Sequence, residues 1–277
     1  MRLRSIFYGG EAAVALERDD GTLARLPEID AIGPDTPLRR LRELAEKADQ
    51  TLDPAEVTMR PVVPHPRRVI CVGLNYRAHV DEGPRDLPTY PVLFTKWASS
   101  LVADGAPVVL PPEENAADYE AELAVVIGER GRRIPPEHTL EHVAGFTIAN
   151  DVSMREHQNR SHQWLQGKAW DSSTPLGPAL VTLEELDDPL ALDISLELNG
   201  EQMQSSNTSL LIFDLPTLIA AISQFTELEP GDVILTGTPG GVGLRRDPPV
   251  ALHDGDVMRV SIGGLGVLEN RVLAETL

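Results

Sequence analysis

Short stretches of alternating or continuous apolar residues dominate this chain, and few stretches have the period of a helix. Period-two alternation with β-branched residues predicts strands, and turn residues separate most of these stretches. The sequence therefore predicts a protein built mainly of short strands. These are expected at residues 6–8, 12–16, 69–72, 91–96, 108–110, 118–128, 143–149, 192–198, 233–236, 257–262 and 265–272.

Two stretches have helical periodicity. Pro37 follows a potential cap and favours a first helical turn, and Asp53-Pro54 is expected to end this helix. Its predicted apolar stripe consists of Leu38, Leu41, Leu44, Ala45 and Ala48. A second helix is predicted within residues 211–225, with Asp214 in its capping region.

The order of these elements predicts an α+β protein in two parts. Residues 1–60 are expected to form a small N-terminal α/β module, with a hairpin turning at Gly9-Gly10. Residues 62–68 contain two prolines, directly follow a third at position 61, and are interpreted as a linker. The remaining stretch, 65–277, is long enough to bury a large core of its own.

Three acidic residues alternate at the start of one predicted strand. Side chains two apart share a face, so Asp118, Glu120 and Glu122 are expected to project together, about 7 Å apart. Clustered carboxylates are costly inside a protein unless they are protonated or bind a cation. Without nearby cysteine or histidine, such a set favours Mg²⁺ or Mn²⁺. A solvated strand end is the alternative interpretation.

A histidine and a glutamate lie three residues apart after the predicted strand 69–72. At this spacing His79 and Glu82 share one face of a helical turn. A carboxylate that orients an imidazole is a common way to build a base that activates water. The alternative is a surface pair without function. The boundary at Gly83-Pro84 predicts a mobile loop suited to a lid.

Polar residues also follow the predicted strand 143–149. Asp151 is placed to point into a site at the end of the sheet and to cap a helical turn over residues 152–158. Within that turn Arg155 and Gln158 face the same way. Lys168 lies between a glycine and small or aromatic residues, which suggests partial burial; an exposed loop lysine is the alternative.

The residues that follow the glycine-rich stretch 237–243 argue against a nucleotide-binding loop. Residues 245–249 after it form a loop rich in arginine and proline, whereas dinucleotide and phosphate loops open a helix. We expect these glycines to let the backbone approach a small ligand.

Composition narrows the possible partners and compartments. The net charge of −19 argues against nucleic acid binding, which needs a basic surface. No apolar run is long enough to cross a membrane, and the N-terminus lacks a secretory signal. The single cysteine, Cys71, excludes an internal disulfide, so a cytoplasmic protein is the simplest expectation.

The combined motifs resemble the fumarylacetoacetate hydrolase family over about residues 65–275. The resemblance rests on motifs that occur in order: 73–76 leading to His79 and Glu82, 118–123, 150–153 with Arg155 and Gln158, 167–168, 230–232 and 236–239. It implies a mixed β-roll with few helices and a homodimer. The first 60 residues look like the variable small domain of bacterial members.

The resemblance also implies nine site residues of three kinds. The metal ligands would be Glu120, Glu122 and Asp151, holding Mg²⁺ or Mn²⁺, with Ca²⁺ also possible. The catalytic residues would be His79, Glu82 and Lys168. The substrate contacts would be Arg155, Gln158 and Thr238. Asp118 would then have a supporting role.

The implied activity is hydrolysis of a carbon–carbon bond in an acylpyruvate-type 2,4-dioxo acid through a metal-bound enolate. His79, oriented by Glu82, would take a proton from water, and Lys168 would stabilise the oxyanion. Oxaloacetate decarboxylation and isomerisation of a 2-hydroxy-diene-dioate use the same enolate and are alternatives. A non-enzymatic acid-binding or scaffold protein is a further alternative.

Overall fold

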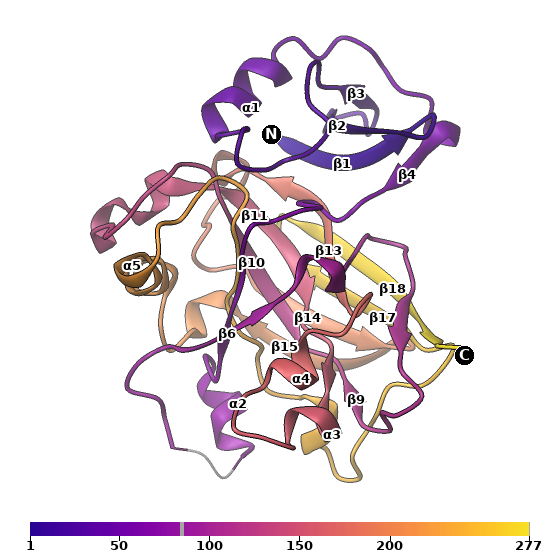
Figure 1. Ribbon diagram of the computed structural model, residues 1–277, viewed down its shortest axis with the longest axis vertical. Helices are drawn as coiled ribbons and strands as arrows, with labels where there is room; N and C mark the ends of the chain where they lie inside the picture. The colour runs from indigo at the N-terminus through magenta and orange to yellow at the C-terminus, as the bar shows by residue number, and fades with distance from the viewer. Residues whose placement is uncertain (84–85, 277) are drawn as a thin grey trace.

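A long mixed sheet forms the frame of the protein (Figure 1). The computed structural model describes residues 1–83 and 86–276. The strand order of this sheet is β3-β2-β1-β13-β11-β10-β16-β5-β6, with β4 paired to β1 and β7 paired to β13. Its strands are β1 (Arg2–Tyr8), β2 (Glu11–Glu17), β3 (Leu23–Arg25), β4 (Val57–Met59), β5 (Val69–Gly73), β6 (Val92–Lys96), β7 (Leu101–Val102), β10 (Ala121–Ile127), β11 (Val143–Asn150), β13 (Thr174–Val181) and β16 (Val233–Leu235).

A five-stranded sheet packs against this frame, in the order β15-β14-β17-β18-β8. Leu123 and Phe146 of the first sheet share one apolar core with Leu196 and Val260 of the second. The second sheet and a short separate pair consist of β8 (Val108–Leu110), β14 (Asp193–Leu198), β15 (Glu201–Asn207), β17 (Val257–Ile262), β18 (Gly266–Ala274), β9 (Ala117–Asp118) and β12 (Ser153–Met154). The predicted Asn199-Gly200 hairpin joins β14 to β15, with both turn residues at positive φ.

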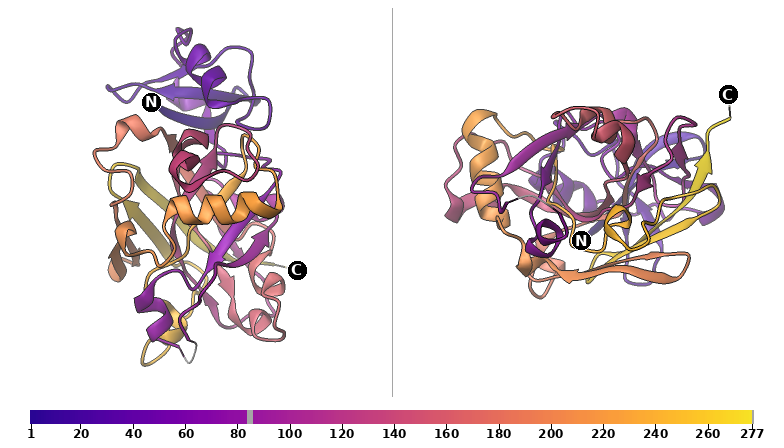
Figure 2. Two further views of the ribbon diagram at one scale, coloured as in Figure 1. Left: turned by 90° about the vertical axis from the view of Figure 1, so that its left-hand side faces the viewer. Right: turned by 90° about the horizontal axis from the view of Figure 1, so that it is seen from below.

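Helices are few and lie outside the sheets. In Figure 2 the longest, α5, lies across one side of the main body, and in Figure 1 α2, α3 and α4 gather at the end opposite the N-terminal module. The α-helices are α1 (Leu38–Ala45), α2 (Arg77–Asp81), α3 (Arg155–Gln158), α4 (Leu165–Lys168) and α5 (Leu215–Phe225). The 3₁₀ helices are η1 (Pro54–Glu56), η2 (Ala98–Ser100), η3 (Pro136–His142), η4 (Leu183–Glu185), η5 (Thr208–Leu210) and η6 (Gly243–Arg245).

Strands β10, β11 and β13 are buried at every residue, because sheet and loops cover both of their faces. This explains their near-continuous apolar sequences. The predicted α+β class, with mostly sheet and few helices, is confirmed. Since these buried strands cannot shift without disrupting the core, the residues at their ends have fixed positions.

The N-terminal module continues the long sheet rather than standing apart from it. The predicted hairpin forms between β1 and β2, and β1 also pairs with β13 through Leu3 and Leu180. Val62 and Val63, in the stretch interpreted as a linker, are fully buried in a core that both parts share. The division into 1–60 and 65–277 stays a prediction, because this shared core joins the two parts.

Two boundaries differ from the sequence-based expectation. Helix α1 ends at Ala45, far short of Asp53, and the chain continues through a loop. Helix α5 begins at Leu215, where the Asp214 carboxylate accepts a hydrogen bond from the backbone N–H of Thr217. The mobile loop predicted from Gly83-Pro84 begins at residues 84–85, which lie outside the described residues.

Candidate active site

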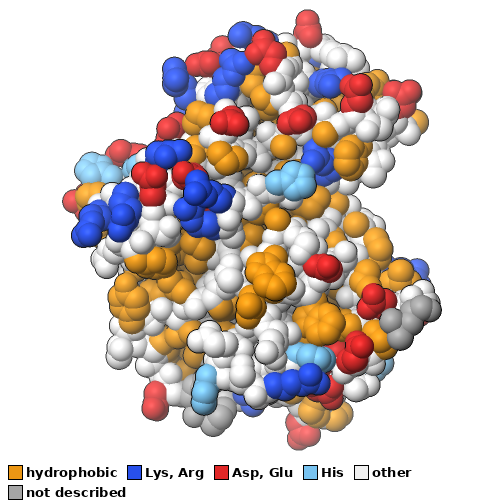
Figure 3. Space-filling view, in the orientation of Figure 1, with side chains coloured by type: hydrophobic (Ala, Val, Ile, Leu, Met, Phe, Trp, Pro, Cys, Tyr) orange, Lys and Arg blue, Asp and Glu red, His pale blue; other side chains and the backbone are white. Residues whose placement is uncertain are grey.

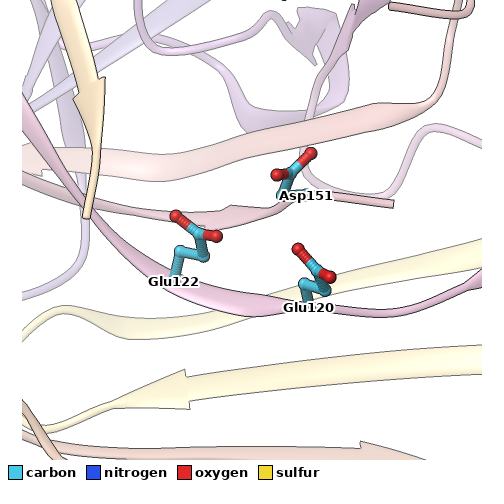
Figure 4. Close-up of side chains that lie close together, drawn as sticks. All are labelled: Glu120, Glu122 and Asp151. Carbon is cyan, nitrogen blue, oxygen red and sulfur yellow. The ribbon is translucent and has the colours of Figure 1, made fainter. Parts of the chain in front are cut away.

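Three buried carboxylates converge at one place in the main body (Figure 4). Glu120, Glu122 and Asp151 each offer an oxygen atom, and these oxygens lie within 4.8 Å of one another. All three residues are at most 5% exposed. The three metal ligands implied by the resemblance are therefore brought together from two segments of the chain.

Antiparallel pairing of β10 with β11 produces this convergence. Ala121 at the start of β10 is opposite Asn150 at the end of β11, so the residues just outside the two strands become neighbours. The Asn150 side chain accepts a hydrogen bond from the Glu120 backbone N–H, and Asp151 N–H donates to the Glu120 carbonyl. These bonds hold the two acidic segments in one fixed arrangement.

Asp118 does not join the three carboxylates. The predicted strand 118–128 is interrupted, because Asp118 ends β9 whereas β10 begins at Ala121. Its carboxylate instead accepts hydrogen bonds from Arg155 at 2.9 and 2.7 Å and from the backbone N–H groups of Gly243 and Leu244. The expectation of one shared acidic face was wrong for Asp118, since the interruption turns this residue away.

Three buried cations neutralise much of the acidic charge. Lys168 Nζ lies 2.6 Å from Glu120 Oε2 and 2.7 Å from Asp151 Oδ2. Lys96 Nζ lies 2.7 Å from Asp151 Oδ1, and Arg155 Nη2 lies 2.6 Å from Glu120 Oε1. Paired charges of this kind avoid the large desolvation cost of an isolated buried ion.

The pKa values of two glutamates move in opposite directions. Burial by itself raises the pKa of Glu120, but the positive charges of Lys168 and Arg155 outweigh it and lower the pKa to about 2. Burial, reinforced by the charges of Asp151 and Glu120, raises the pKa of Glu122 well above its usual range. Glu122 Oε2 accepts a hydrogen bond from the Gly237 N–H at 2.7 Å but has no ion pair among the described residues.

The numbers of negative and positive charges in the site test whether a divalent ion fits. When all are ionised, Asp118 and the three convergent carboxylates carry four negative charges, whereas Lys96, Arg155 and Lys168 carry three positive charges. Carboxylate oxygens are the donors that Mg²⁺ and Mn²⁺ prefer. The donor set and the uncompensated charge at Glu122 therefore fit a hard divalent cation.

Asp151 does not cap a helix as the sequence suggested. Residues 153–154 form strand β12, and α3 begins only at Arg155. Both carboxylate oxygens of Asp151 accept hydrogen bonds from lysine ammonium groups instead. The cap prediction was wrong because two buried cations compete for this carboxylate.

His79 and Glu82 meet at the edge of the same pocket. His79 lies on α2, and its Nδ1 atom is 3.5 Å from Glu82 Oε2. The other oxygen of Glu82 accepts a hydrogen bond from the Gly241 N–H at 2.6 Å. His79 Nδ1 is buried and has no hydrogen-bond partner among the described residues, so a small rotation toward Glu82 would complete the pair.

Two of the three carboxylates, the histidine and the substrate contacts implied by the resemblance line one cavity of about 80 Å³. Glu120, Glu122, His79 and Lys168 lie in its wall, together with a second set of polar residues. That second set is Arg155, Gln158, Asn159, Thr238 and Arg245. Lys168 Nζ also lies 5.1 Å from the centre of the Phe94 ring, which makes a cation–π contact.

Hydrogen bonds within the protein determine what the pocket residues still offer a ligand. Thr238 Oγ1 accepts a hydrogen bond from Gln204, so its own hydrogen remains to be donated. Gln158 Oε1 accepts from Arg155 Nη1, which leaves the amide N–H₂ of Gln158 as a donor. Arg155 uses most of its donors on the protein and therefore mainly orients Asp118 and Glu120.

The glycine-rich segment closes one side of the pocket. Gly237 has a φ of +103°, and a Cβ there would lie 2.7 Å from the Asn75 Cβ. Only glycine allows this turn and the close approach that presents its N–H to Glu122. As expected, these glycines bring the backbone close to the site, and only the short η6 follows them.

Lys96 and Gln204 are two site residues that sequence reasoning missed. Gln204 links the start of β10 to Thr238, and no local motif marks it. For Lys96 a signal existed, because the chain has 21 arginines but only three lysines: Lys47, Lys96 and Lys168. A lysine at the end of an apolar strand in such a chain is a candidate for a buried ion pair.

Sheets enclosing a buried carboxylate cluster with buried cations beside it define an enzyme-like site. Residues 68–273 match the family model described as fumarylacetoacetate (FAA) hydrolase C-terminal. The chain therefore belongs to the fumarylacetoacetate hydrolase family.

Curated relatives of the chain carry the name oxaloacetate tautomerase. The chain is 48% identical over 220 residues to oxaloacetate tautomerase Fahd2a, mitochondrial, of Rattus norvegicus. This match covers 79% of the chain and 70% of the relative. It is 41% identical over 275 residues to oxaloacetate tautomerase fahd2, mitochondrial, of Xenopus laevis. This match covers 94% of the chain and 86% of the relative.

Solved structures of similar proteins extend over the whole chain. A putative HpcE protein from Mycobacterium smegmatis has a TM-score of 0.88 at 38% identity and covers 100% of both chains. Maleylpyruvate hydrolase from Sphingobium sp. SYK-6, in complex with manganese (II) ion and pyruvate, has a TM-score of 0.79 at 28% identity and covers 100% of both chains. The predicted family and its fold class are confirmed.

The compartment stays a prediction. Among the described residues, no helix is both long and apolar enough to cross a membrane. The names of several relatives place them in mitochondria, so a strictly cytoplasmic assignment has no support from the comparisons.

Proposed function

We propose that the protein is a divalent-metal-dependent tautomerase of a small 2-oxo diacid of the oxaloacetate type. The observation that carries this proposal is the buried set of three carboxylates and three cations beside a cavity of about 80 Å³. A water molecule needs about 10–15 Å³ by the same measure, so the cavity has room for about five to eight such groups. A four-carbon acid suits this space, and curated relatives are named oxaloacetate tautomerases.

Glu120, Glu122 and Asp151 would hold Mg²⁺ or Mn²⁺, and Ca²⁺ is a further candidate. When bound, such an ion would attract the substrate carboxylate and stabilise negative charge on the 2-oxo oxygen. With the ion present, the four carboxylates and three cations would carry one net positive charge. The site would then attract an anion although the whole chain carries −19.

Lys168 would act as a fixed cation rather than as a base. Burial favours its neutral form, but the carboxylates of Asp151 and Glu120 more than offset this and raise the pKa of Lys168. It therefore keeps its proton at neutral pH. Two of its hydrogens bind carboxylates, which leaves the third for the substrate oxygen that becomes negative in the enolate.

His79 would move the proton. It is the only histidine in the wall of the described cavity, and Glu82 is positioned to orient its ring. Conversion of an enol to a keto acid removes the proton from the enol oxygen and adds one at the neighbouring carbon. An imidazole with a carboxylate partner is suited to this exchange near neutral pH.

Hydrolysis of an acylpyruvate is the second candidate, and the His79–Glu82 pair favours it. The same imidazole would take a proton from water, and water would attack the distal carbonyl. A solved structure at 28% identity is a maleylpyruvate hydrolase with manganese and pyruvate. The decarboxylase and diene-dioate isomerase alternatives require the same residues.

The test compares these reactions on one preparation. We expect purified protein with Mg²⁺ or Mn²⁺ to accelerate ketonisation of enol-oxaloacetate, followed by ultraviolet absorbance, without cleaving acylpyruvates. His79→Ala should lower kcat by about 10²–10⁴-fold, while the Mn²⁺ affinity measured by calorimetry stays unchanged. His138→Ala is a matched control, because His138 pairs with Glu141 at the same spacing but is exposed and outside the pocket.

Two results would contradict this assignment. Cleavage of an acylpyruvate at a rate above that of ketonisation would make the hydrolase the main activity. Equal rates for His79→Ala and His138→Ala would remove His79 from the proton transfer, whatever the reaction proves to be.

The homodimer implied by the resemblance is also part of the proposal. Trp97 and Phe225 are 55% and 61% exposed and line a groove beside the edge strand β6. Exposed apolar surface of this kind supports burial against a second copy. Light scattering coupled to size-exclusion chromatography should give a mass near twice 30.2 kDa.

A further inference from the structure

Arg245 is a cation in the wall of the active-site cavity whose guanidinium has no partner in the part of the chain that the structure describes. It ends the 3₁₀ helix η6 and lines the cavity together with His79, Glu120 and Lys168. Among residues 1–83 and 86–276, its guanidinium makes no hydrogen bond or ion pair. Arg155 in the same wall is bound to Asp118 and Glu120.

The neighbouring Arg246, in contrast to Arg245, has hydrogen-bond partners for its guanidinium among the described residues. Arg246 donates hydrogen bonds to the carbonyls of Gly241 and Met203, at 3.3 and 2.6 Å, and so fastens the loop. Arg246 is absent from the residues that line the cavity, whereas Arg245 is among them. One arginine therefore holds the loop, and the other presents its charge to the cavity.

The loop that carries Arg245 is tied to the carboxylate cluster. The backbone N–H groups of Gly243 and Leu244 bind the Asp118 carboxylate at 2.7 and 3.2 Å. Asp118 in turn binds Arg155, and Arg155 binds Glu120. Through this chain of buried contacts the position of η6 is fixed relative to the carboxylates.

The guanidinium lies beside the end of α2. Its Nη2 atom is 3.4 Å from the position that a Cβ on Gly83 would occupy. No carboxylate oxygen of the described residues lies within ion-pair distance of it, and both Glu82 oxygens are directed to other groups: one to Gly241 N–H and one toward His79. Arg245 thus offers several donors without an acceptor at the cavity wall.

We propose that Arg245 binds the distal carboxylate of the substrate and makes the enzyme selective for diacids over monoacids. This inference rests on the proposed function, because it assumes that the proximal carboxylate and 2-oxo group lie at Glu120, Glu122 and Asp151. A planar guanidinium with two parallel N–H donors matches a carboxylate. An acidic protein needs such a local cation to retain a second negative charge.

The test measures binding of two ligands that differ only in the distal group. 2-Oxoglutarate and 2-oxopentanoate have the same chain length, but only the first has a distal carboxylate. With Mg²⁺ present, calorimetry should show about tenfold tighter binding of the diacid to the wild type, as expected for one partly solvated charge-assisted contact. Arg245→Gln should bring the two affinities together, and Arg245→Lys should retain part of the difference.

Arg271→Gln is the matched control, because it removes the same charge from an exposed position on β18 outside the cavity wall. It should keep the tenfold preference. The inference would be overturned if the wild type did not prefer the diacid, or if Arg245→Gln kept that preference. It would also be overturned if Arg245→Gln weakened the binding of both ligands equally. A preference that depends on Arg245 without any ketonisation of oxaloacetate would overturn only the proposed reaction.

Discussion

At the scale of single residues, the site is a balance of buried charges rather than an acidic cluster awaiting a metal. Every oxygen of Glu120 and Asp151 has a cationic partner within 2.7 Å, whereas Glu122 has none among the described residues. The clustered carboxylates suggested only protonation or a bound cation as compensation. Lysine and arginine side chains supply a third form of compensation, which requires residues distant in the sequence.

Replacement of Lys96 by methionine tests this balance. Lys96→Met would leave one oxygen of Asp151 without its partner, and breaking a buried ion pair typically costs about 3–5 kcal/mol. We expect the free energy of unfolding in urea to fall by that amount without added metal, and Mg²⁺ to restore part of it. Lys47→Met, at an exposed position, should change stability by less than about 0.5 kcal/mol. Equal stability of the two variants would show that Lys96 does not compensate Asp151.

At the scale of elements, register and strand ends decide where the polar groups lie. The pairing of Ala121 with Asn150 makes the start of β10 and the end of β11 neighbours. Asp104, shortly after the end of β7, is another polar residue placed by its neighbours: its carboxylate accepts a hydrogen bond from the Glu269 N–H of β18. Burial raises the pKa of Asp104 although this hydrogen bond lowers it, so burial of the charged carboxylate carries a cost.

Asp104→Asn should therefore stabilise the protein at neutral pH. An acid whose pKa is raised by folding favours folding below its ordinary value of 3.8, and that stability is lost as pH rises through the folded-state pKa. Asparagine keeps the acceptor oxygen and stays neutral. In urea titrations the variant should be more stable than wild type at pH 7.5, and the difference should shrink as the pH falls toward 3.8. A difference that does not depend on pH would contradict this explanation.

At the scale of the whole molecule, the N-terminal module and the main body share one core. Figure 3 shows the module as an upper lobe with an indentation on one side, yet Leu3 and Leu41 pack in the same cluster as Val126 and Leu180. Continuous sheet pairing between β1 and β13 adds to this connection. We therefore expect the two parts to unfold together, as a single cooperative unit.

Leu41→Ala tests this cooperation. Leu41 is fully buried on α1, and the cavity left by its truncation should cost about 2–5 kcal/mol. The three tryptophans, Trp97, Trp164 and Trp170, all lie in the main body and report its unfolding by fluorescence. Hydrogen exchange followed by mass spectrometry reports on residues 1–60. Both midpoints should fall equally, whereas a shift confined to the module would show independent unfolding.

Local patterns in the sequence were enough for the strands, the class of fold and the family. Short alternating or continuous apolar runs placed β10, β11 and β14, because such runs are local to each strand, and ordered motifs marked Glu120, Glu122, Asp151, His79 and Lys168 as candidates. Spacing was not enough for function, however. His138 and Glu141 have the same separation as His79 and Glu82, but of these four residues only His79 lines the cavity.

The tertiary structure alone decided which charges meet. It turned Asp118 toward Arg155, gave Asp151 two lysines in place of a helix cap, and left Arg245 at the cavity wall without an ion-pair partner in the described part of the chain. The physical reason is that a strand sets its own periodicity locally, whereas a buried charge is stabilised by partners that only the folded chain brings within 3 Å. The sequence determined the candidates, and the pairing of distant segments determined their roles.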